Sequence, residues 1–261
     1  MLKIKSYVKV NSIAEAYELN QKKTACVLGG MVWLKMGNRN ISTAIDLSGL
    51  GLEGIQETDD EFVIGCMTSL RALETDKRLN EYTQGAIRES VRHIVGVQFR
   101  NCATVGGSIW GRYGFSDVLT MFLGMDTWVE LYNAGKIPLT EFVNRKKDND
   151  ILVNIIVRKQ PLRVCYMSQR NTKTDFPVLT CAISLRDGQV YTAVGARPSR
   201  AVCLCVSEAD WKKKGSEALA GELAAQFPTE GNMRAGKEFR SHLAEVLIGR
   251  GLKQIEKMQE V

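Results

Sequence analysis

The first 46 residues alternate between short apolar runs and one amphipathic stretch. In "SIAEAYELN", residues 12–20, apolar side chains recur at helical spacing, and Ser12 and Glu15 have the spacing of a capping box. The runs "ACVL" and "TAIDLS" have the pattern of short buried strands, and Gly29-Gly30 ends the first of them. The pattern therefore predicts a β-α-β-like module with a glycine pair at the carboxyl end of a strand.

The middle of the chain changes between strand and helix patterns. The segment "EFVIGCMTSLRAL" pairs a strand with the start of a helix, and residues 84–95 have a helical pattern. The segment "SDVLTMFLGMD" predicts a helix capped by Ser116, whereas "TWVELYN" and the apolar "ILVNIIV" predict strands.

Charged residues and Pro161 interrupt the pattern at 158–163, and we predict a domain boundary there. Three strand-like runs follow, of which "LRDGQVY" contains an Asp187-Gly188 hairpin turn, and a mostly helical tail closes the chain. The chain contains no repeats and no low-complexity linker. This order of elements predicts an α+β fold class in two packed units.

Composition narrows the class of protein. With 261 residues, of which 44% are apolar, the chain can bury a sizeable core. No stretch approaches the roughly 18 apolar residues of a membrane span, and the charged start does not resemble a signal peptide, so we expect a cytoplasmic protein with no membrane contact. The net charge of +6 is spread along the chain between acidic residues, which favours a solvated surface over nucleic-acid binding.

The cysteine pattern indicates reduced thiols. Seven cysteines are an odd number, and most lie in apolar runs such as "VLTCAISL". The only close pair, Cys203 and Cys205, lacks the two further ligands that a zinc or iron–sulfur site needs. We therefore expect no metal on this chain.

Two glycine-rich stretches imitate nucleotide-binding motifs. The segment "SGLGLEG" has the spacing G-x-G-x-x-G, but it continues into acidic and strand-like residues where a dinucleotide fingerprint needs a helix. The segment "GNMRAGKE", residues 231–238, places Glu238 where a P-loop needs Ser or Thr. We interpret it as the start of the final helix.

Gly29-Gly30 and Gly106-Gly107 stand in similar contexts. Each pair follows a short β-prone run and precedes a stretch able to turn helical. Glycine lets the backbone approach a ligand closely, and successive N–H groups can form a concave anion site. Two such loops facing one another could hold both phosphates of a dinucleotide, although either pair alone is more often a plain turn.

The stretch "FRNCATVGGSIWGRYGFSDVL" resembles the FAD-binding subunit, or domain, of the molybdenum hydroxylases, which include xanthine dehydrogenases and aerobic-type carbon monoxide dehydrogenases. The motif of that family is approximately I-R-N-x-A-T-I-G-G-N-I followed by S-P-x-S-D-L-L-P. Upstream, "VLGGMVWLKM" is similar to A-G-G-T-D-L-L-V-K-M and "AIDLSGL" to L-I-D-L-S. The resemblance continues to "GKEFRSHLAEVLIGRGL" and so covers essentially the whole chain.

The resemblance implies a fold in two parts. A vanillyl-alcohol-oxidase-like FAD-binding domain would span residues 1–160, in halves of about 1–52 and 53–160. A smaller α+β domain like the C-terminal domain of carbon monoxide dehydrogenase flavoproteins would span 161–261.

The resemblance also implies where FAD would bind. Its pyrophosphate would lie over both glycine loops, Ser116 and Asp117 would hydrogen-bond toward its ribityl or ribose portion, and a strand would lie by its flavin and adenine parts. The implied cofactor-binding residues are Val27, Leu28, Gly29, Gly30, Met31, Val32, Ala103, Thr104, Gly106, Gly107, Ser108, Ser116, Asp117, Ile151 and Leu152.

On this resemblance, the chain is expected to be the FAD-carrying subunit of a multi-subunit, xanthine dehydrogenase-like oxidoreductase. Electrons would come from a 2Fe2S cluster on a small partner subunit and leave toward NAD or another acceptor. Molybdopterin would reside on a large partner subunit. The cofactor supplies the redox chemistry, so no residue of this chain is expected to act as a general base.

An alternative follows from one departure from the family pattern. The first glycine loop is one residue short, so that Met31 or Val32 replaces the family's Thr-Asp pair. A lost charge-assisted hydrogen bond costs about 1.5–3 kcal/mol. The alternative is therefore a degenerate, flavin-free scaffold subunit that only holds its partners together.

Overall fold

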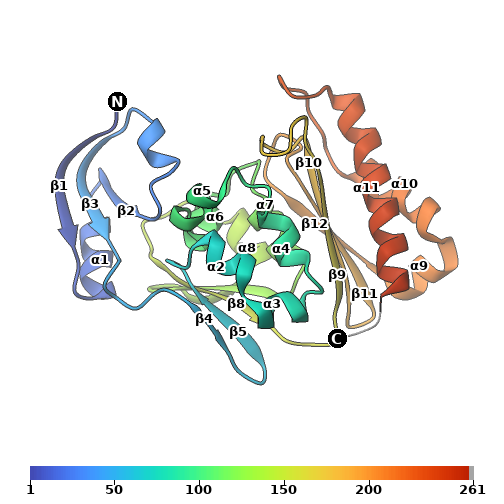
Figure 1. Cartoon of the computed structure of the whole chain (residues 1–261), viewed down its shortest axis with the longest axis horizontal. Helices are drawn as coiled ribbons and strands as arrows, with labels where there is room; N and C mark the ends of the chain where they lie inside the picture. The colour runs from blue at the N-terminus through green and yellow to red at the C-terminus, as the bar shows by residue number, and fades with distance from the viewer. Residues whose placement is uncertain (259–261) are drawn as a thin grey trace. The chain divides into compact units, whose positions relative to one another are not determined.

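The computed structural model describes residues 1–258, which form two compact units (Figure 1). The first unit contains Met1–Leu73, Val97–Gly111 and Thr127–Arg158. The second contains Glu74–Gly96, Arg112–Asp126 and the chain from Lys159 onward. Both units are thus assembled from separate stretches of the sequence, and the predicted domain boundaries near 52 and 160 stay a prediction.

The first unit begins with a parallel three-stranded sheet in the order β1-β3-β2. Its helix is capped as predicted, because the Ser12 hydroxyl accepts a hydrogen bond from the Glu15 N–H and the Glu15 carboxylate accepts one from the Asn11 N–H. The elements are β1 (Lys3–Lys9), α1 (Ile13–Asn20), β2 (Ala25–Leu28), the 3-10 helix η1 (Leu34–Met36) and β3 (Asn40–Asp46).

A five-stranded sheet in the order β4-β5-β8-β6-β7 completes the first unit. Its central strand β8 is the apolar run predicted as a buried strand, and α6 and α8 pack against the sheet. The elements are β4 (Ile55–Glu57), β5 (Glu61–Gly65), α5 (Val97–Cys102), α6 (Val105–Gly111), β6 (Thr127–Leu131), β7 (Gly135–Pro138), α8 (Leu139–Asn144) and β8 (Leu152–Arg158), while α2 (Leu70–Thr75) leads into the second unit.

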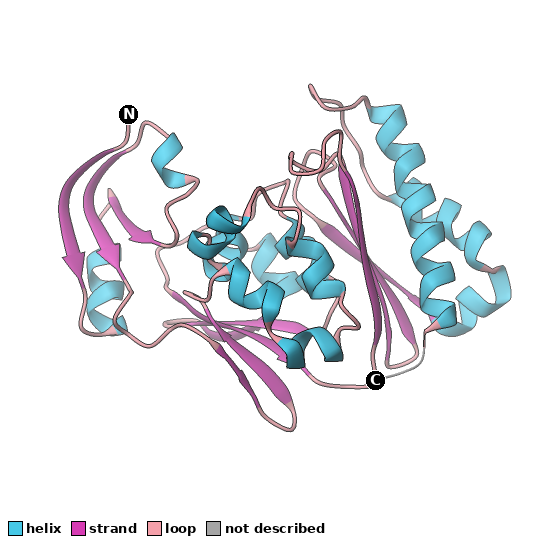
Figure 2. Cartoon of the chain, viewed as in Figure 1, coloured by secondary structure: helices cyan, strands magenta, loops and turns pink. Residues whose placement is uncertain are grey.

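The second unit is built on an antiparallel sheet in the order β12-β11-β10-β9. The long helix α11 packs on one face of this sheet, and α4 and α7 contact its strands as well (Figure 2). The elements are α3 (Lys77–Tyr82), α4 (Ala86–Val91), α7 (Asp117–Leu123), β9 (Arg163–Gln169), β10 (Leu179–Arg186), β11 (Gln189–Gly195), β12 (Val202–Ser207), α9 (Glu208–Lys214), α10 (Ser216–Gln226) and α11 (Lys237–Lys257).

Several predicted elements are confirmed. Asp187 and Gly188 both adopt positive φ, 49° and 65°, in the two-residue turn that joins β10 to β11. No helix follows "SGLGLEG", because the chain enters β4 instead. Gly236 of "GNMRAGKE" is the N-cap of the final helix α11.

Three predictions of local structure are wrong. The β-prone run just before Gly106-Gly107, residues 101–105, forms no strand: α5 (Val97–Cys102) ends in it and α6 begins at Val105, because long-range hydrogen bonds override its local strand preference. The helix expected over 84–95 begins only at Ala86, after Gly85 in the left-handed region, and ends at Val91. Four strands, β9 to β12, stand where three strand-like runs were expected.

Candidate functional site

The first glycine loop, residues 29–32, follows the last residue of β2. No group in the described part of the chain accepts a hydrogen bond from the N–H groups of these four residues. Met31 has a φ of 57°, in the left-handed region, and its carbonyl accepts a hydrogen bond from the Lys35 N–H. A left-handed residue among unpaired N–H groups is the geometry in which backbone forms a concave anion site.

The two glycine loops contact one another, as the sequence led us to expect. A Cβ atom on Gly29 would lie 2.8 Å from the Thr104 hydroxyl oxygen. A Cβ atom on Gly30 would lie only 1.8 Å from the Cys102 carbonyl oxygen, which no real atom pair tolerates. Glycine is therefore required here by the packing of one loop on the other.

The second glycine pair lies in the first turn of α6 and not in a loop as expected, and the N–H groups of this turn are already bonded within the chain. Val105 donates to the Thr68 carbonyl at 2.8 Å, and Gly106 donates to the Cys66 carbonyl at 2.9 Å. The Thr104 hydroxyl accepts from Gly107 at 3.1 Å. The Ser108 N–H donates to the Thr104 carbonyl at 3.1 Å, as does the Ser108 hydroxyl at 3.0 Å. Thr104 thus caps α6, and the first turn of this helix has no spare donor among residues 105–108.

The remaining predicted residues of the first unit have apolar side chains in or near its core. Ile151 is 1% exposed, and its N–H donates to the Asp150 carboxylate at 2.8 Å. Leu152 begins the central strand β8 and is also buried. Leu28 and Ala103 are buried, whereas Val27 and Val32 are half-buried.

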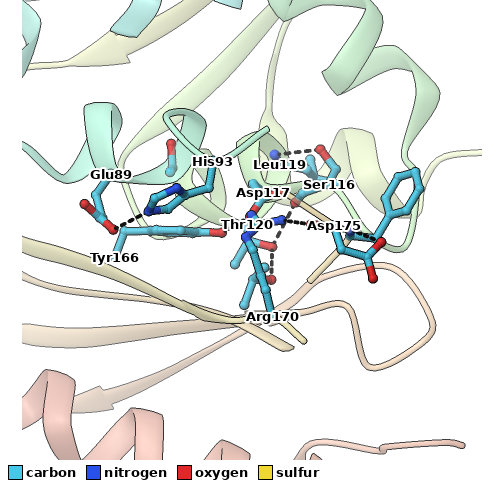
Figure 3. A network of polar contacts seen from close by, with 12 residues as sticks. Glu89, His93, Ser116, Asp117, Leu119, Thr120, Tyr166, Arg170 and Asp175 are labelled. Carbon is cyan, nitrogen blue, oxygen red and sulfur yellow. Dashed lines mark hydrogen bonds and ion pairs between the residues drawn. The ribbon is translucent and has the colours of Figure 1, made fainter. Parts of the chain in front are cut away.

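Ser116 and Asp117 lie in the second unit, where both side chains have partners inside the fold (Figure 3). The Ser116 hydroxyl accepts a hydrogen bond from the Leu119 N–H at 3.0 Å and so caps α7. The Asp117 carboxylate accepts a hydrogen bond from the Tyr166 hydroxyl at 2.6 Å and forms an ion pair with Arg170. Arg170 also donates to the Asp175 carbonyl at 2.5 Å, which fixes the loop between β9 and β10.

Burial governs the electrostatics of this network. Burial raises the pKa of the Asp117 carboxyl, although the Arg170 guanidinium and the Tyr166 hydroxyl both oppose the shift. Burial, together with the neighbouring Asp117 carboxylate, also raises the pKa of the Tyr166 hydroxyl well above its ordinary value. The network therefore keeps Tyr166 as a hydrogen-bond donor throughout the physiological range of pH.

Sequence reasoning missed Tyr166 and Arg170 as the partners of Asp117. Both follow it by about 50 residues, on and just after β9. The only signal was an unbalanced Asp at the start of a strongly apolar helix, since a buried carboxylate needs a donor. Such a signal predicts that a partner exists, but it does not say which residue it is.

Residues 1–258 contain neither a cluster of metal ligands nor a membrane-spanning helix. No group of three or more His, Cys, Asp or Glu side chains in that range is placed to hold a metal ion. Within the same range, no helix has the length and apolar character that crossing a membrane would require.

Comparison with known proteins identifies the first 159 residues. The model of the family described as the FAD binding domain in molybdopterin dehydrogenase matches residues 2–159. The chain is 25% identical over 258 residues to the Escherichia coli protein YgfM, with 94% of both chains covered. It is also 25% identical, over 59% of this chain and 57% of the relative, to the alpha subunit of the 6-hydroxypseudooxynicotine dehydrogenase complex of Paenarthrobacter nicotinovorans.

Solved structures share the fold over nearly the full length. A chain of carbon monoxide dehydrogenase from Oligotropha carboxidovorans superposes with a TM-score of 0.84 at 20% identity, covering 97% of this chain and 98% of that chain. A chain of quinoline 2-oxidoreductase from Pseudomonas putida gives a TM-score of 0.82 at 16% identity, with 96% of both chains covered. The mixed α and β fold is therefore that of these oxidoreductase chains.

Proposed function

Because this chain belongs to the family of FAD-binding domains in molybdopterin dehydrogenases, we propose that it is the FAD-carrying electron-transfer subunit of a multi-subunit molybdenum hydroxylase. The alpha subunit of the 6-hydroxypseudooxynicotine dehydrogenase complex and the chains of carbon monoxide dehydrogenase and quinoline 2-oxidoreductase support this proposal. Two of these names refer to N-heterocyclic compounds, which supports a purine or other N-heterocycle as the class of substrate. The proposed location of the protein is the cytoplasm.

In the proposed complex, this chain binds FAD, and partner subunits bind the molybdopterin and the 2Fe2S cluster. Electrons reach this chain from the 2Fe2S partner and leave toward an acceptor such as NAD. The fold that fits is a two-part FAD-binding domain over 1–160 followed by a flavoprotein C-terminal domain over 161–261. Ser116, Asp117, Ile151 and Leu152 keep their proposed cofactor roles on the resemblance alone.

The first glycine loop carries the proposal, because residues 29–32 fit the pyrophosphate of FAD. Their four N–H groups have no acceptor among the described residues, and they follow the carboxyl end of a parallel strand, where nucleotide ligands commonly bind. A diphosphate bears charge that such donors stabilise without any cationic side chain. The loss of the family's Thr-Asp side chains therefore leaves the main-chain donors in place.

FAD, when bound, supplies the redox chemistry, namely the uptake of single electrons and the release of an electron pair. The residues of this chain bind and orient it. Gly29 and Gly30 let the first loop lie against the second. The N–H groups of residues 29–32 would donate hydrogen bonds to the pyrophosphate. The Thr104 hydroxyl caps α6 and lies against Gly29 of the first loop.

One observation favours the alternative of a flavin-free scaffold subunit. The N–H groups of residues 105–108 all have acceptors inside the chain, so the second loop offers fewer donors than the sequence suggested. The two candidates differ in a single measurable property, which is the affinity for FAD.

Titration of the purified chain with flavins tests the proposal. We expect FAD to bind with a shifted visible spectrum, and ADP to compete because it shares the pyrophosphate. FMN lacks the pyrophosphate and should bind more weakly by about tenfold or more, which is about 1.4 kcal/mol or more. Absence of FAD binding, both alone and with the partner subunits present, would leave the scaffold alternative.

A further inference from the structure

Strand β9 is one of the two edge strands of the second unit's sheet, and its free edge points away from β10. In an antiparallel pair, alternate residues direct their N–H and C=O groups to opposite sides. The Gln169 carbonyl accepts from Val178 beside β10, so the odd-numbered residues of β9 bond inward. The Val164 N–H donates outward to the Gln84 side chain at 3.4 Å, so Val164, Tyr166 and Ser168 face the edge.

Most of this edge has no hydrogen-bond partner in the part of the chain that the structure describes. In residues 1–258, nothing accepts from the Tyr166 and Ser168 N–H groups, and nothing donates to the carbonyls of Val164, Tyr166 and Ser168. Tyr166 as a whole is only 4% exposed. Its main-chain groups are thus largely shielded from bulk water without having a protein partner, which is an unfavourable state for strong hydrogen-bonding groups.

A groove of about 360 Å³ runs along this edge. Strand β9 contributes Val164 to Met167 to its lining. The walls come from the elements that pack on the two faces of β9, namely α4 with its preceding turn, and α11. In Figure 3 the Glu89 side chain lies beside the Tyr166 ring. The polar wall residues are Gln84, Glu89, Arg92 and Gln254.

Strand β9 also lacks the residues that often prevent an edge strand from pairing with another chain. It contains no proline and no lysine over Arg163–Gln169, and its pairing with β10 has no bulge. The edge strand β1 of the first unit is different, because Lys3, Lys5 and Lys9 lie along it. Charged lysines discourage pairing with another chain, and β9 has none of them.

We propose that the β9 groove is a docking site for an extended segment of a partner subunit, which adds to the sheet as an outer strand. Main-chain hydrogen bonds to Tyr166 and Ser168 supply the recognition, and the polar walls favour polar side chains on the segment. The part of β9 that lines the groove, Val164 to Met167, has the length of an added strand of about four residues. This inference rests on the proposed function, because it takes the partner from that complex.

The shape of the groove favours a single extended segment over a second copy of this chain. In a symmetric pairing of β9 with itself, each copy would bring its own α4 and α11 to the same edge. Those helices already form both walls of the groove. The β9 edge of a second copy, with its own α4 and α11 beside it, would therefore not fit into the groove. A single extended strand without flanking helices would fit.

Hydrogen exchange in the purified complex tests the proposal. The chain is co-purified with its molybdopterin-binding and 2Fe2S subunits, and amide exchange is compared with that of the chain alone. We expect exchange at Tyr166 and Ser168 to slow by about tenfold or more on assembly. FAD content is measured on the same samples.

Two pairs of variants separate docking from folding. Gln254→Trp fills the groove from an exposed position of α11, and Lys257→Trp places the same side chain on that helix outside the groove. Ser168→Pro removes one outward N–H, a position where an edge strand tolerates proline, and Ser168→Ala retains it. We expect the first member of each pair to weaken assembly by about tenfold and the second to leave it unchanged.

Each other result overturns the inference. If the complex assembles with FAD but exchange at β9 and the affinity of Gln254→Trp are unchanged, the docking site is wrong and the proposed function stands. Concentration-dependent protection in the chain alone would identify a second copy as the occupant. If the three subunits do not associate, the docking inference fails, and FAD binding by the chain then decides whether the flavoprotein assignment fails with it.

Discussion

At the scale of single residues, the first glycine loop depends on two backbone positions. Gly30 has no space for a side chain, because the Cys102 carbonyl occupies the position of its Cβ. Met31 next to it adopts a positive φ of 57°, which costs a non-glycine residue roughly 1–2 kcal/mol. The loop therefore holds a strained conformation that leaves its N–H groups unpaired.

Gly30→Ala should destabilise the first unit by at least about 1–3 kcal/mol, the usual cost of overpacking. The added methyl group would meet backbone, which cannot move aside as a side chain can. The matched control is Gly249→Ala on α11, where the new Cβ would lie 3.5 Å from the Ala220 Cβ, an ordinary contact. This control should be neutral or stabilising by up to about 1 kcal/mol. Urea unfolding of both variants measures the difference, and equal midpoints would contradict the packing of the two loops.

The family resemblance implied that the two glycine stretches lie together, but the sequence did not reveal that the N–H groups of the second are already hydrogen-bonded. The acceptors of Val105 and Gly106 are carbonyls of Thr68 and Cys66, nearly 40 residues earlier in the chain. Such long-range pairs leave no local pattern in the sequence. For the same reason the sequence identified Asp117 but not Tyr166 or Arg170.

At the scale of elements, caps and turns were the most predictable features. Ser12, Ser116 and the Asp187-Gly188 turn act through residues within four positions, so the sequence contains the whole interaction. The helix α5 was not predictable, because its six residues are held by their surroundings and have a weak helical preference of their own.

Ser116→Ala should cost about 1 kcal/mol of unfolding free energy, because the Leu119 N–H loses its acceptor at the start of α7. Ser116→Asp retains an acceptor at the cap and should recover that stability. Thermal unfolding measures the cap, and FAD titration of the same variants measures the proposed cofactor contact. If alanine and aspartate have equal stability, the hydroxyl does not act as the cap.

The buried thiols of β9 and of the turn after β5 should make stability fall at high pH. Burial raises the pKa of both Cys66 and Cys165 to about 12, from an ordinary value of 9.0. Between these values the unfolded thiols lose protons while the folded ones keep them. The unfolding free energy should therefore be unaffected by them below pH 9 and fall above it, by about 1.4 kcal/mol per pH unit for each thiol.

Urea unfolding between pH 8 and pH 10.5 measures this effect through variants. Cys165→Ala should show a shallower fall with pH than the unmodified chain. The exposed Cys102 is the control, and Cys102→Ala should leave the slope unchanged. An identical pH dependence in Cys165→Ala would show that burial does not hold this thiol protonated.

At the scale of the whole molecule, the units interleave along the sequence. All seven residues of α7 are buried, and Thr120 in its middle hydrogen-bonds to Thr180 on β10 at 2.9 Å. The sequence pattern predicted α7 and β10 separately. It could not predict that they share a core, because about 60 residues and several elements of the first unit separate them.

The fragment 1–158 should therefore fail to fold as a stable unit. It contains α4 and α7 but lacks the strands β9 to β11 that cover them, so the apolar face of α7 would be exposed to water. We expect aggregation, or a thermal transition without cooperativity, in contrast to the full chain. A soluble monomeric fragment with a sharp melting transition would contradict this prediction.

The interleaving also has a consequence during synthesis. When α7 leaves the ribosome, the sheet that will cover it has not yet been made, and β11 ends at Gly195, some 70 residues later. At the usual rate of translation, this delay lasts on the order of ten seconds. For that time the face of α7 that the sheet will cover is exposed in the nascent chain, and such an apolar face is a binding target for cellular chaperones. The yield of this protein in a cell should accordingly depend on how well chaperones protect α7 from aggregation until the strands that cover it have been synthesised.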